Sequence, residues 1–404
     1  MEDIYGNLLS EQAIANEKRI CLLVLDGLGD VDNSGKGTAL EIAKTPNFDA
    51  LTKKSALGES IPVARGITPG SGPGHIGLFG YDPIFYQIGR GVLSALGVEF
   101  EIKQGDVAAR LNFCTLDENG NVVDRRAGRI PTDENERVLQ KIKDNIKKPE
   151  GIDMHLMTES EHRAVLVLRG KGLDDNVGDT DPQQTGIPPL DPARDEHASS
   201  KTAKMVNGLL DQIKDILRDE KQANFILTRG FAQLPSWPSF AERWKLKPAA
   251  VAGYPMYRGV ARLFGMPVVA TPTEAKGICE EAAKALKDHT FVFAHFKYTD
   301  KTGEDGDLDA KVKRIEEMDA ALPALLEAKP DVLIITGDHS TPPALKAHSW
   351  HAVPMLMQAP YLRGPFLDRF HEKTCIQGEL GTITAKEIIP LALAHSDKLQ
   401  KFGA

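Results

Sequence analysis

Three short apolar runs in this chain lead into acidic residues, and they limit the folds that the chain can adopt. The runs begin at Ile20, Phe291 and Val332, within ICLLVLDGLGD, HTFVFAHFKYTD and DVLIITGDHS. A continuous apolar run of this length is typical of a strand buried on both faces of a parallel sheet. We therefore predict an open α/β sheet, in which functional sites lie outside the carboxyl ends of the strands.

The segments between these runs predict helices that cover the sheet. Apolar residues recur at helical spacing in 309–327, and helices are also expected at 47–54 and 273–287. Helices between parallel strands pack on both faces of a sheet. The fold class that we predict is α/β, with a mostly parallel sheet wrapped by helices.

A second domain is expected between residues 105 and 248. Short strands, a loop rich in Gly, Asp and Pro, and a helix at 199–219 follow one another there. At 404 residues the chain also exceeds the usual size of a single core. We predict a discontinuous domain formed by residues 1–104 and 249–404, with a smaller α+β domain of residues 105–248 inserted into it.

The charge balance and the cysteines exclude several classes of partner. The chain has 49 basic and 57 acidic residues, and it contains no basic run of the kind that follows a nucleic-acid backbone. No apolar stretch reaches the length of a membrane span, and the acidic opening segment does not resemble a signal peptide. The cysteines are scattered, without a CxxC pair. We expect a cytoplasmic protein with reduced thiols and no nucleic-acid or membrane partner, and the sequence leaves its oligomeric state open.

Candidate metal ligands follow two of the predicted strands. Asp26 follows the first strand, although an Asp in this place is commonly a turn or cap residue. The segment TGDHSTPPALKAHSWHAVP is more specific, because Asp338 and His339 are adjacent at a strand end and His348 follows closely. Carboxylates and imidazoles on converging loops are a usual way to hold divalent metals. The alternative is a solvated loop with incidental histidines, and we favour His348 over the nearby His351 as the ligand.

Two further acids follow the second strand, in YTDKTGEDGDLD. Asp300 and Glu304 are four residues apart, so both could reach one metal if they lie on one helical turn. Acidic residues also simply favour helix starts, which is the competing interpretation.

A candidate nucleophile lies in ITPGSGPGHIGLFGYDP. Ser71 is flanked by glycines that permit tight backbone geometry, and Pro73 suits a first helical position. A serine presented at such a turn can attack phosphorus if a metal ion activates its hydroxyl. The alternative is a plain N-cap serine. We expect His75 to pack behind the site.

Cations that could bind a phosphorylated substrate are concentrated in and near the insert. Arginine is preferred where bidentate contacts to phosphate or carboxylate matter, although most arginines are ordinary surface residues. The candidates are Arg125, Arg126, Arg129, Arg163, Arg229, Arg258 and, after the second strand, Lys297.

Taken in order, several segments resemble the archaeal type of cofactor-independent phosphoglycerate mutase, a family of the alkaline phosphatase superfamily. They are DGLGD, SGPGHIGLFGYDP, DRRAGR, EHRAVLVLRG, GDTDP, TDKTGEDGD, GDHSTP and KAHS. Each segment alone is weakly specific. Their combination spans most of the chain, from about Cys21 to Pro354.

The resemblance implies an alkaline-phosphatase-like domain, an inserted domain that clamps the substrate, and a phosphoserine intermediate. It implies interconversion of 3-phosphoglycerate and 2-phosphoglycerate without 2,3-bisphosphoglycerate. Two divalent metals are implied, with manganese the usual expectation and magnesium, cobalt or zinc not excluded. By this resemblance one metal is held by Asp26, Ser71, Asp338 and His339, and the other by Asp300 and His348.

The chain departs from the family pattern in two places. Glu304 stands where members of the family commonly carry a histidine, and a carboxylate there favours manganese or magnesium over zinc. Gly72, Pro73 and Gly74 follow Ser71 where the archaeal pattern tends to have Asp, Thr and Ser. The Ser-x-x-Gly-His spacing is retained and resembles the bacterial branch, so Ser71 keeps its assignment.

Three other functions fit parts of this pattern. They are a metal-dependent phosphomonoester or phosphonate hydrolase, a phosphotransferase acting on another small phosphorylated metabolite, and a non-catalytic protein that binds one. The arginine-rich insert argues against the hydrolase, and the intact set of candidate ligands argues against the binding protein.

Overall fold

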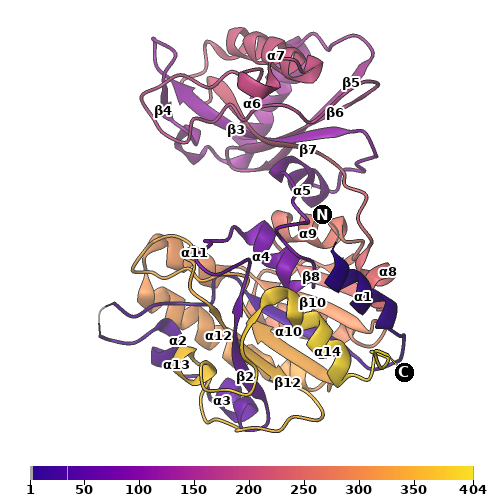
Figure 1. Ribbon diagram of the computed structural model, residues 1–404. Coiled ribbons are helices and arrows are strands. Elements are labelled where there is room, and N and C mark those ends of the chain that lie inside the picture. The colour runs from indigo at the N-terminus through magenta and orange to yellow at the C-terminus, as the bar shows by residue number, and fades with distance from the viewer. Residues whose placement is uncertain (1–2, 34, 404) are drawn as a thin grey trace. The chain divides into compact units, whose positions relative to one another are not determined.

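The chain divides into two units, drawn in Figure 1. The computed structural model describes residues 3–33 and 35–403. Unit 1 comprises Met1–Gln87 and Pro238–Ala404, and unit 2 comprises Ile88–Trp237. Unit 2 is therefore one continuous segment, whereas unit 1 is built from both ends of the chain.

The observed boundaries lie at 87/88 and 237/238, whereas the sequence predicted them at 104/105 and 248/249. Two helices account for the difference. Helix α5 (Arg90–Gly97) packs on the sheet of unit 2 so closely that a Cβ on Gly91 would lie 2.0 Å from Ala108 O. Helix α8 (Phe240–Trp244) instead belongs to unit 1, where the Phe240 ring lies 4.4 Å from that of Phe291. Tight packing of α5 and α8, which sequence spacing does not reveal, moves both boundaries toward the N-terminus.

The sheet of unit 1 has β1 (Ile20–Leu25) near its centre. This strand pairs in parallel with β10 (Phe291–Phe296) on one side and with β11 (Val332–Thr336) on the other. The strand order is β13-β2-β12-β11-β1-β10-β8-β9, and only β12 runs antiparallel to its neighbours. The other strands are β2 (Ala56–Ile61), β8 (Pro248–Ala252), β9 (Val268–Ala270), β12 (Val353–Gln358) and β13 (Gly381–Thr384). The predicted α/β class with a mostly parallel sheet is confirmed.

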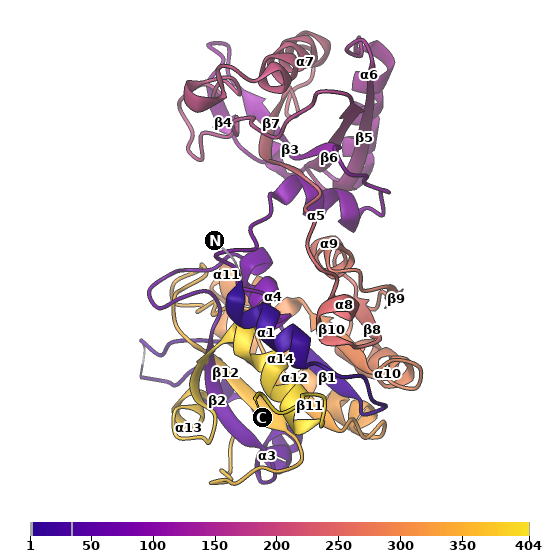
Figure 2. The same cartoon turned by 45° about the vertical axis from the view of Figure 1, so that its right-hand side comes forward.

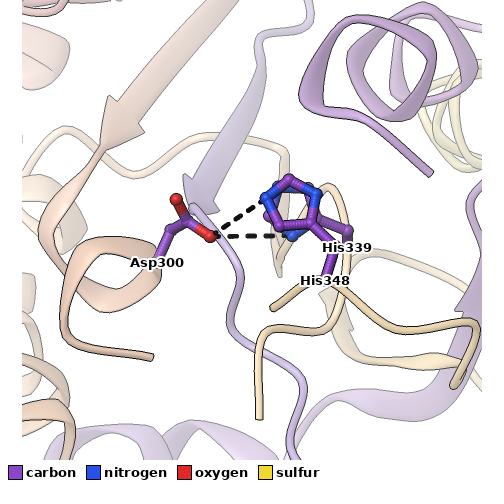
Figure 3. Close-up of side chains that lie close together, drawn as sticks. All are labelled: Asp300, His339 and His348. Carbon is purple, nitrogen blue, oxygen red and sulfur yellow. Dashed lines mark ion pairs between the residues drawn. The ribbon is translucent and has the colours of Figure 1, made fainter. Parts of the chain in front are cut away.

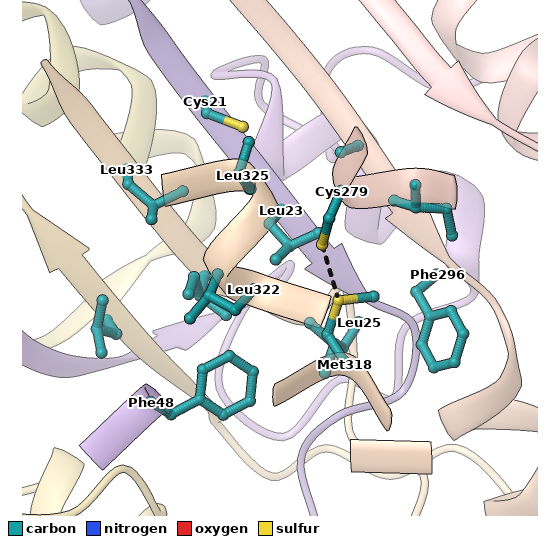
Figure 4. Close-up of a cluster of buried hydrophobic side chains, with 14 of the residues drawn as sticks. Cys21, Leu23, Leu25, Phe48, Cys279, Phe296, Met318, Leu322, Leu325 and Leu333 are labelled. Carbon is teal, nitrogen blue, oxygen red and sulfur yellow. Dashed lines mark hydrogen bonds between the residues drawn. The ribbon is translucent and has the colours of Figure 1, made fainter. Parts of the chain in front are cut away.

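Both faces of this sheet are covered, as the side chains of β10 illustrate. Phe293 packs edge-on against Phe79 on one face, at a centroid distance of 5.0 Å. Val292 and Ala294, which point to the opposite face, join the apolar cluster drawn in Figure 4, in which Met318 of α12 (Leu308–Leu326) also lies. Burial of alternate residues on two faces explains why β10 is apolar without interruption.

The helices of unit 1 include those predicted at 47–54, 273–287 and 309–327. The first is observed as α3 (Pro46–Thr52), the second as α10 (Ala275–Ala285) and the third as α12. The remaining α-helices are α1 (Ile4–Gln12), α2 (Ala39–Ile42), α4 (Ser71–Leu78), α9 (Pro255–Leu263), α11 (Tyr298–Asp305), α13 (Glu372–Cys375) and α14 (Ile388–His395). Within the described ranges, no helix has both the length and the apolarity to cross a bilayer.

In unit 1 the chain just after α1 pairs with the segment near the C-terminus, and Figure 2 draws α1 beside α14. Ile14 N donates to Lys398 O and Gln400 N donates to Gln12 O, both at 2.9 Å. This pairing closes the discontinuous unit.

Unit 2 contains a five-stranded sheet covered by helices. Strands β4-β3-β6-β5 follow in that order, and β7 pairs with β3. Val138 of α6 and Val206 of α7 are buried in one apolar cluster with Phe113 of β3. The elements are β3 (Val107–Leu116), β4 (Val122–Asp124), α6 (Thr132–Asn145), β5 (Ile152–Ser160), β6 (Arg163–Gly170), α7 (Lys201–Leu217) and β7 (Phe225–Gln233). Helix α7 is the one predicted at 199–219, and its start is capped by Ser200, which accepts from Ala203 N.

Candidate active site

The carboxyl ends of β1, β10 and β11 lie at one edge of the unit 1 sheet, and each leads to a candidate ligand. Asp26 directly follows β1 and is fixed there by its backbone N–H, which donates to Phe296 O at 2.9 Å. Asp338 follows β11 after a single glycine, and Asp300 lies in α11, which begins shortly after β10. Parallel pairing thus gathers residues that are far apart in the sequence.

A first group of candidate metal ligands consists of Asp26, Asp338 and His339. All three are fully buried, and their potential ligand atoms lie within 4.8 Å of one another. His339 Nε2 is 3.3 Å from Asp26 Oδ1 and 3.2 Å from Asp338 Oδ2. In the part of the chain that the structure describes, these two carboxylate oxygens accept no hydrogen bond.

Buried carboxylate oxygens that accept no hydrogen bond are costly, so this group fits a positively charged ligand. Two carboxylates and an imidazole are an ordinary donor set for a divalent transition metal. The residues therefore fit the metal that the sequence predicts at this place.

A second group consists of Asp300, His339 and His348 (Figure 3). Asp300 Oδ1 lies 3.5 Å from His348 Nε2 and 3.9 Å from His339 Nδ1. The two imidazole rings are stacked with their centroids 3.6 Å apart. His339 thus lies between the two groups, whereas the sequence assigned it to the first alone.

Glu304 and His351 lie outside both groups. Glu304 Oε1 is 3.9 Å from His348 Nε2, but its side chain is 55% exposed. His351 Nδ1 is 3.0 Å from Ser349 Oγ, and its ring stacks on Trp350. Glu304 is therefore at the rim of the second group.

Ser71 is the first residue of α4 and faces the first group. Its Oγ lies 3.2 Å from His339 Nε2. The helix begins here, and not at Pro73 as predicted, because Gly74 N donates to Gly70 O at 3.0 Å and closes the first turn. Behind Ser71, the buried His75 has its Nδ1 2.8 Å from Ser71 O and 3.2 Å from Asp338 Oδ2.

Lys297 joins the two groups through its ammonium. Its Nζ lies 2.9 Å from Asp26 Oδ2 and donates to Asp300 Oδ2 at 2.5 Å. Burial opposes the charge, but Asp26, Tyr257 and Asp300 raise the pKa of Lys297 well above its ordinary value. The sequence predicts Lys297 as a substrate-binding cation, and in the structure it contacts the carboxylates of the site.

Electrostatics keep Asp26 ionised. Burial alone would raise its pKa, but the Lys297 ammonium and the neighbouring His295 and His339 rings hold the pKa well below its ordinary value. Tyr257 O–H also donates to Asp26 Oδ2. An ionised Asp26 is the form that a metal ion requires.

Sequence reasoning missed Thr341, Tyr257 and His295. Thr341 Oγ1 donates to Asp300 Oδ1 at 2.7 Å and lies 2.9 Å from His339 Nδ1, so it orients Asp300 and the His339 ring that both groups share. Thr341 follows GDHS closely, which could have suggested it. No comparable signal marks Tyr257 or His295.

The arginines of unit 2 form a second charged centre. Arg110 of β3 lies directly opposite Arg229 of β7. Arg125 makes two hydrogen bonds of 2.8 Å to Asp181, which also lies 3.4 Å from Arg229. Like charges directly opposite one another destabilise a sheet, but each of these arginines also has an acidic neighbour. Asp181 lies beside Arg229, and Glu159 Oε2 lies 3.8 Å from Arg110 Nε.

Several arginines of unit 2 act on the pKa of the buried His162. Burial and then the neighbouring arginines lower this pKa to about 3. The arginines responsible are Arg163, Arg110, Arg126 and Arg129. Arg90, at the start of α5, is depressed in pKa to about 10 by burial and by Arg229 and Arg110.

Of the predicted arginines, Arg258 alone lies in unit 1, on α9. Arg90 and Arg110 were not predicted. Their positions near the other arginines depend on strand register and on the packing of α5, and neither leaves a local signal in the sequence.

Comparisons with known proteins identify the family to which the chain belongs. Residues 52–223 match the model of a family described as 2,3-bisphosphoglycerate-independent phosphoglycerate mutase. A protein of Thermus thermophilus, named "Probable 2,3-bisphosphoglycerate-independent phosphoglycerate mutase", is 52% identical over 98% of this chain and 99% of its own length. A protein of Thermotoga maritima with the same name is 48% identical over 100% of this chain and 99% of its own.

Solved structures are also similar. The cofactor-independent phosphoglycerate mutase of Thermoplasma acidophilum is 31% identical, with a TM-score of 0.69 over 94% of this chain and 100% of its own. A structure from Pyrococcus horikoshii has a TM-score of 0.81 at 30% identity, over 96% of this chain and 100% of its own. With identity of this level over nearly the whole chain, the protein belongs to the family of 2,3-bisphosphoglycerate-independent phosphoglycerate mutases.

Proposed function

We propose that the protein interconverts 3-phosphoglycerate and 2-phosphoglycerate, with Ser71 carrying the phosphoryl group between the two positions. Membership of the mutase family supports the overall reaction. The observation that carries the route is the position of Ser71 Oγ, 3.2 Å from His339 Nε2 at the start of α4. A hydroxyl among metal-ligand side chains is placed to act as a nucleophile.

When bound, two divalent cations, which we take to be Mn²⁺ with Mg²⁺, Co²⁺ or Zn²⁺ as substitutes, would neutralise phosphate oxygens and lower the pKa of the Ser71 hydroxyl. One position would be formed by Asp26, Ser71, Asp338 and His339, and the other by Asp300 and His348, with Glu304 at its rim.

The reaction then consists of two displacements at phosphorus. Ser71 Oγ attacks the phosphorus of 3-phosphoglycerate, the bond to the C3 oxygen breaks, and this oxygen gains a proton as the serine hydroxyl loses one. The C2 hydroxyl of the same glycerate attacks the phosphoserine and loses its proton, while Ser71 Oγ leaves and regains one. The atoms and charges balance without 2,3-bisphosphoglycerate.

We assign substrate anion binding to the predicted arginines, which are Arg125, Arg126, Arg129, Arg163, Arg229 and Arg258. The pairing of Arg110 opposite Arg229 supports this assignment, because a bound phosphate or carboxylate would relieve the repulsion between them. Lys297 has a different task, because its ammonium contacts both Asp26 and Asp300 and holds the two carboxylates in position.

The test is an assay of the purified protein with Mn²⁺ and 3-phosphoglycerate, coupled to enolase, with free phosphate measured in parallel. We expect phosphoenolpyruvate without matching release of phosphate. Release of phosphate alone would instead identify a hydrolase.

The phosphoserine route is tested by Ser71→Ala. This change should abolish turnover and remove the phosphoryl group that mass spectrometry detects on the acid-quenched parent protein. The exposed Ser199→Ala is the control and should behave like the parent. Normal turnover in Ser71→Ala would contradict the route.

A further inference from the structure

Lys311 of α12 is a fully buried lysine behind the candidate metal site. Its Nζ donates to Gly27 O at 2.9 Å, to Thr341 O at 3.0 Å and to Gly29 O at 3.1 Å. An ammonium group has three N–H donors, so all of them are used on backbone carbonyls. Two of these carbonyls belong to the loop after β1 and one belongs to the loop after β11.

Both loops carry metal-ligand candidates, and Lys311 touches none of the ligand atoms. Gly27 follows Asp26, and its N–H donates to Asp338 Oδ1 at 3.1 Å. Thr341 orients Asp300 and His339 through its hydroxyl. Lys311 therefore contacts the backbone of residues that themselves hold candidate ligands of both groups.

The two loops approach each other closely at this point. Gly27 has a φ of +62°, and a Cβ there would lie 2.5 Å from Thr341 Oγ1. Such a close approach of two loops leaves little freedom for either. A small displacement of one loop would therefore change the spacing between Asp26 and the ligands that follow β11.

Burying an ammonium group costs free energy, because the charge loses its hydration. Burial lowers the pKa of Lys311, and the buried Asp30 and Glu372 offset this effect only in part. An apolar side chain of similar length would avoid the cost of desolvating the charge. The three directed donors supply something that apolar packing lacks, which is a fixed geometry for carbonyls from two loops.

We propose that Lys311 is a positioning residue that holds the β1 and β11 loops in register and thereby sets the affinity of the site for divalent cations. This inference rests on the proposed function only in requiring that the site bind metal. It makes no use of the phosphoserine chemistry.

The experiment is titration of the metal-free, full-length protein with Mn²⁺, in which free Mn²⁺ is followed by electron paramagnetic resonance without substrate. Lys311→Met keeps the length of the side chain and removes the donors. We expect its Mn²⁺ affinity to fall by about 10- to 100-fold, as for other residues that support metal ligands. Affinity equal to that of the parent would overturn the proposal.

Two controls on the same helix separate positioning from general stability. Lys313→Met removes the same charge from an exposed position and should leave both affinity and melting temperature unchanged. Asp319→Asn weakens a buried anchor to α3, where Asp319 accepts from Phe48 N at 2.7 Å, so it should lower the melting temperature but not the Mn²⁺ affinity. If Asp319→Asn lost as much Mn²⁺ affinity as Lys311→Met, the effect of Lys311 would be one of general stability, and the proposal would be overturned.

A second substitution at Lys311 decides the matter if Lys311→Met does not fold. Lys311→Arg retains the charge, but its planar donors cannot converge on three carbonyls from one atom. It should fold and bind Mn²⁺ more weakly than the parent, and parental affinity would overturn the proposal. Failure of the parent itself to bind Mn²⁺ would instead contradict the proposed function.

Discussion

Glu304 differs from the other candidate ligands in exposure. Its side chain is 55% exposed, whereas that of Asp300 is 2% exposed. Its Oε1 nevertheless lies 3.9 Å from His348 Nε2. A carboxylate at the rim of the second group would offer a bound metal an oxygen, where a histidine would offer a nitrogen.

We predict that Glu304→His shifts metal selection from Mn²⁺ toward Zn²⁺, because imidazole favours zinc more than a carboxylate does. The measurement is metal analysis after the metal-free protein is loaded from an equimolar mixture of the two ions. Glu304→Gln removes the charge without adding a ring nitrogen and serves as the control. The same Mn²⁺ to Zn²⁺ ratio in parent and Glu304→His would refute the prediction.

Glu372 is a buried acid whose titration affects the stability of the protein. Its carboxylate accepts from Asp30 N at 3.1 Å and from Thr38 Oγ1 at 2.6 Å, and burial raises its pKa to about 7. The ordinary value is 4.5, so between these pH values the folded protein holds a proton that the unfolded chain releases. The contribution of Glu372 to the free energy of unfolding is therefore largest below pH 4.5 and declines as the pH rises through about 7.

Glu372→Gln should remove this part of the pH dependence, since the amide does not titrate. Urea unfolding of unit 1 between about pH 5 and pH 8 measures the slope, with the exposed Glu327→Gln as the control. An unchanged slope in Glu372→Gln would be inconsistent with a raised pKa.

At the scale of elements, α4 depends on how closely it approaches the β11 loop. A Cβ on Gly74 would lie 2.4 Å from Asp338 O, so α4 can carry Ser71 to the site only with glycine here. Gly74→Ala should displace the helix start, destabilise the protein by about 1–3 kcal/mol and reduce kcat, as measured by thermal unfolding and the coupled assay. Gly208→Ala, in the open middle of α7, should instead stabilise by about 0.4–1 kcal/mol and leave kcat unchanged. Parental kcat in Gly74→Ala would contradict this account of α4.

The elements also show what local sequence can predict. The apolar run of β1 and the apolar spacing of α12 are enough to predict both elements. The acids at the strand ends are predictable because parallel strands end at the same edge of a sheet. Lys311 and Lys313 occupy one short stretch of the same helix, yet one is buried and the other exposed. Only the packing of α12 on distant loops distinguishes them. The pairing of Arg110 with Arg229 likewise depends on a register between strands far apart in the chain.

At the scale of the whole molecule, the two units have separate cores, and the candidate metal ligands all lie in unit 1. Calorimetry should therefore resolve a transition for each unit, with Mn²⁺ raising the temperature of only one. A ligand at 100 times its dissociation constant stabilises the state that binds it by about 2.7 kcal/mol. Chelation should reverse the shift, and an equal shift of both transitions would contradict the assignment of the metal site to unit 1.

The place of β1 between β10 and β11 has a consequence for biosynthesis. Asp26 and Ser71 leave the ribosome early, but both neighbours of β1 are encoded after the whole of unit 2. The nascent chain therefore carries an apolar strand with two open edges while unit 2 folds beside the exit tunnel. Such a strand exposes unpaired backbone groups along both edges, and these groups stay open to pairing with other chains until β10 and β11 have been translated.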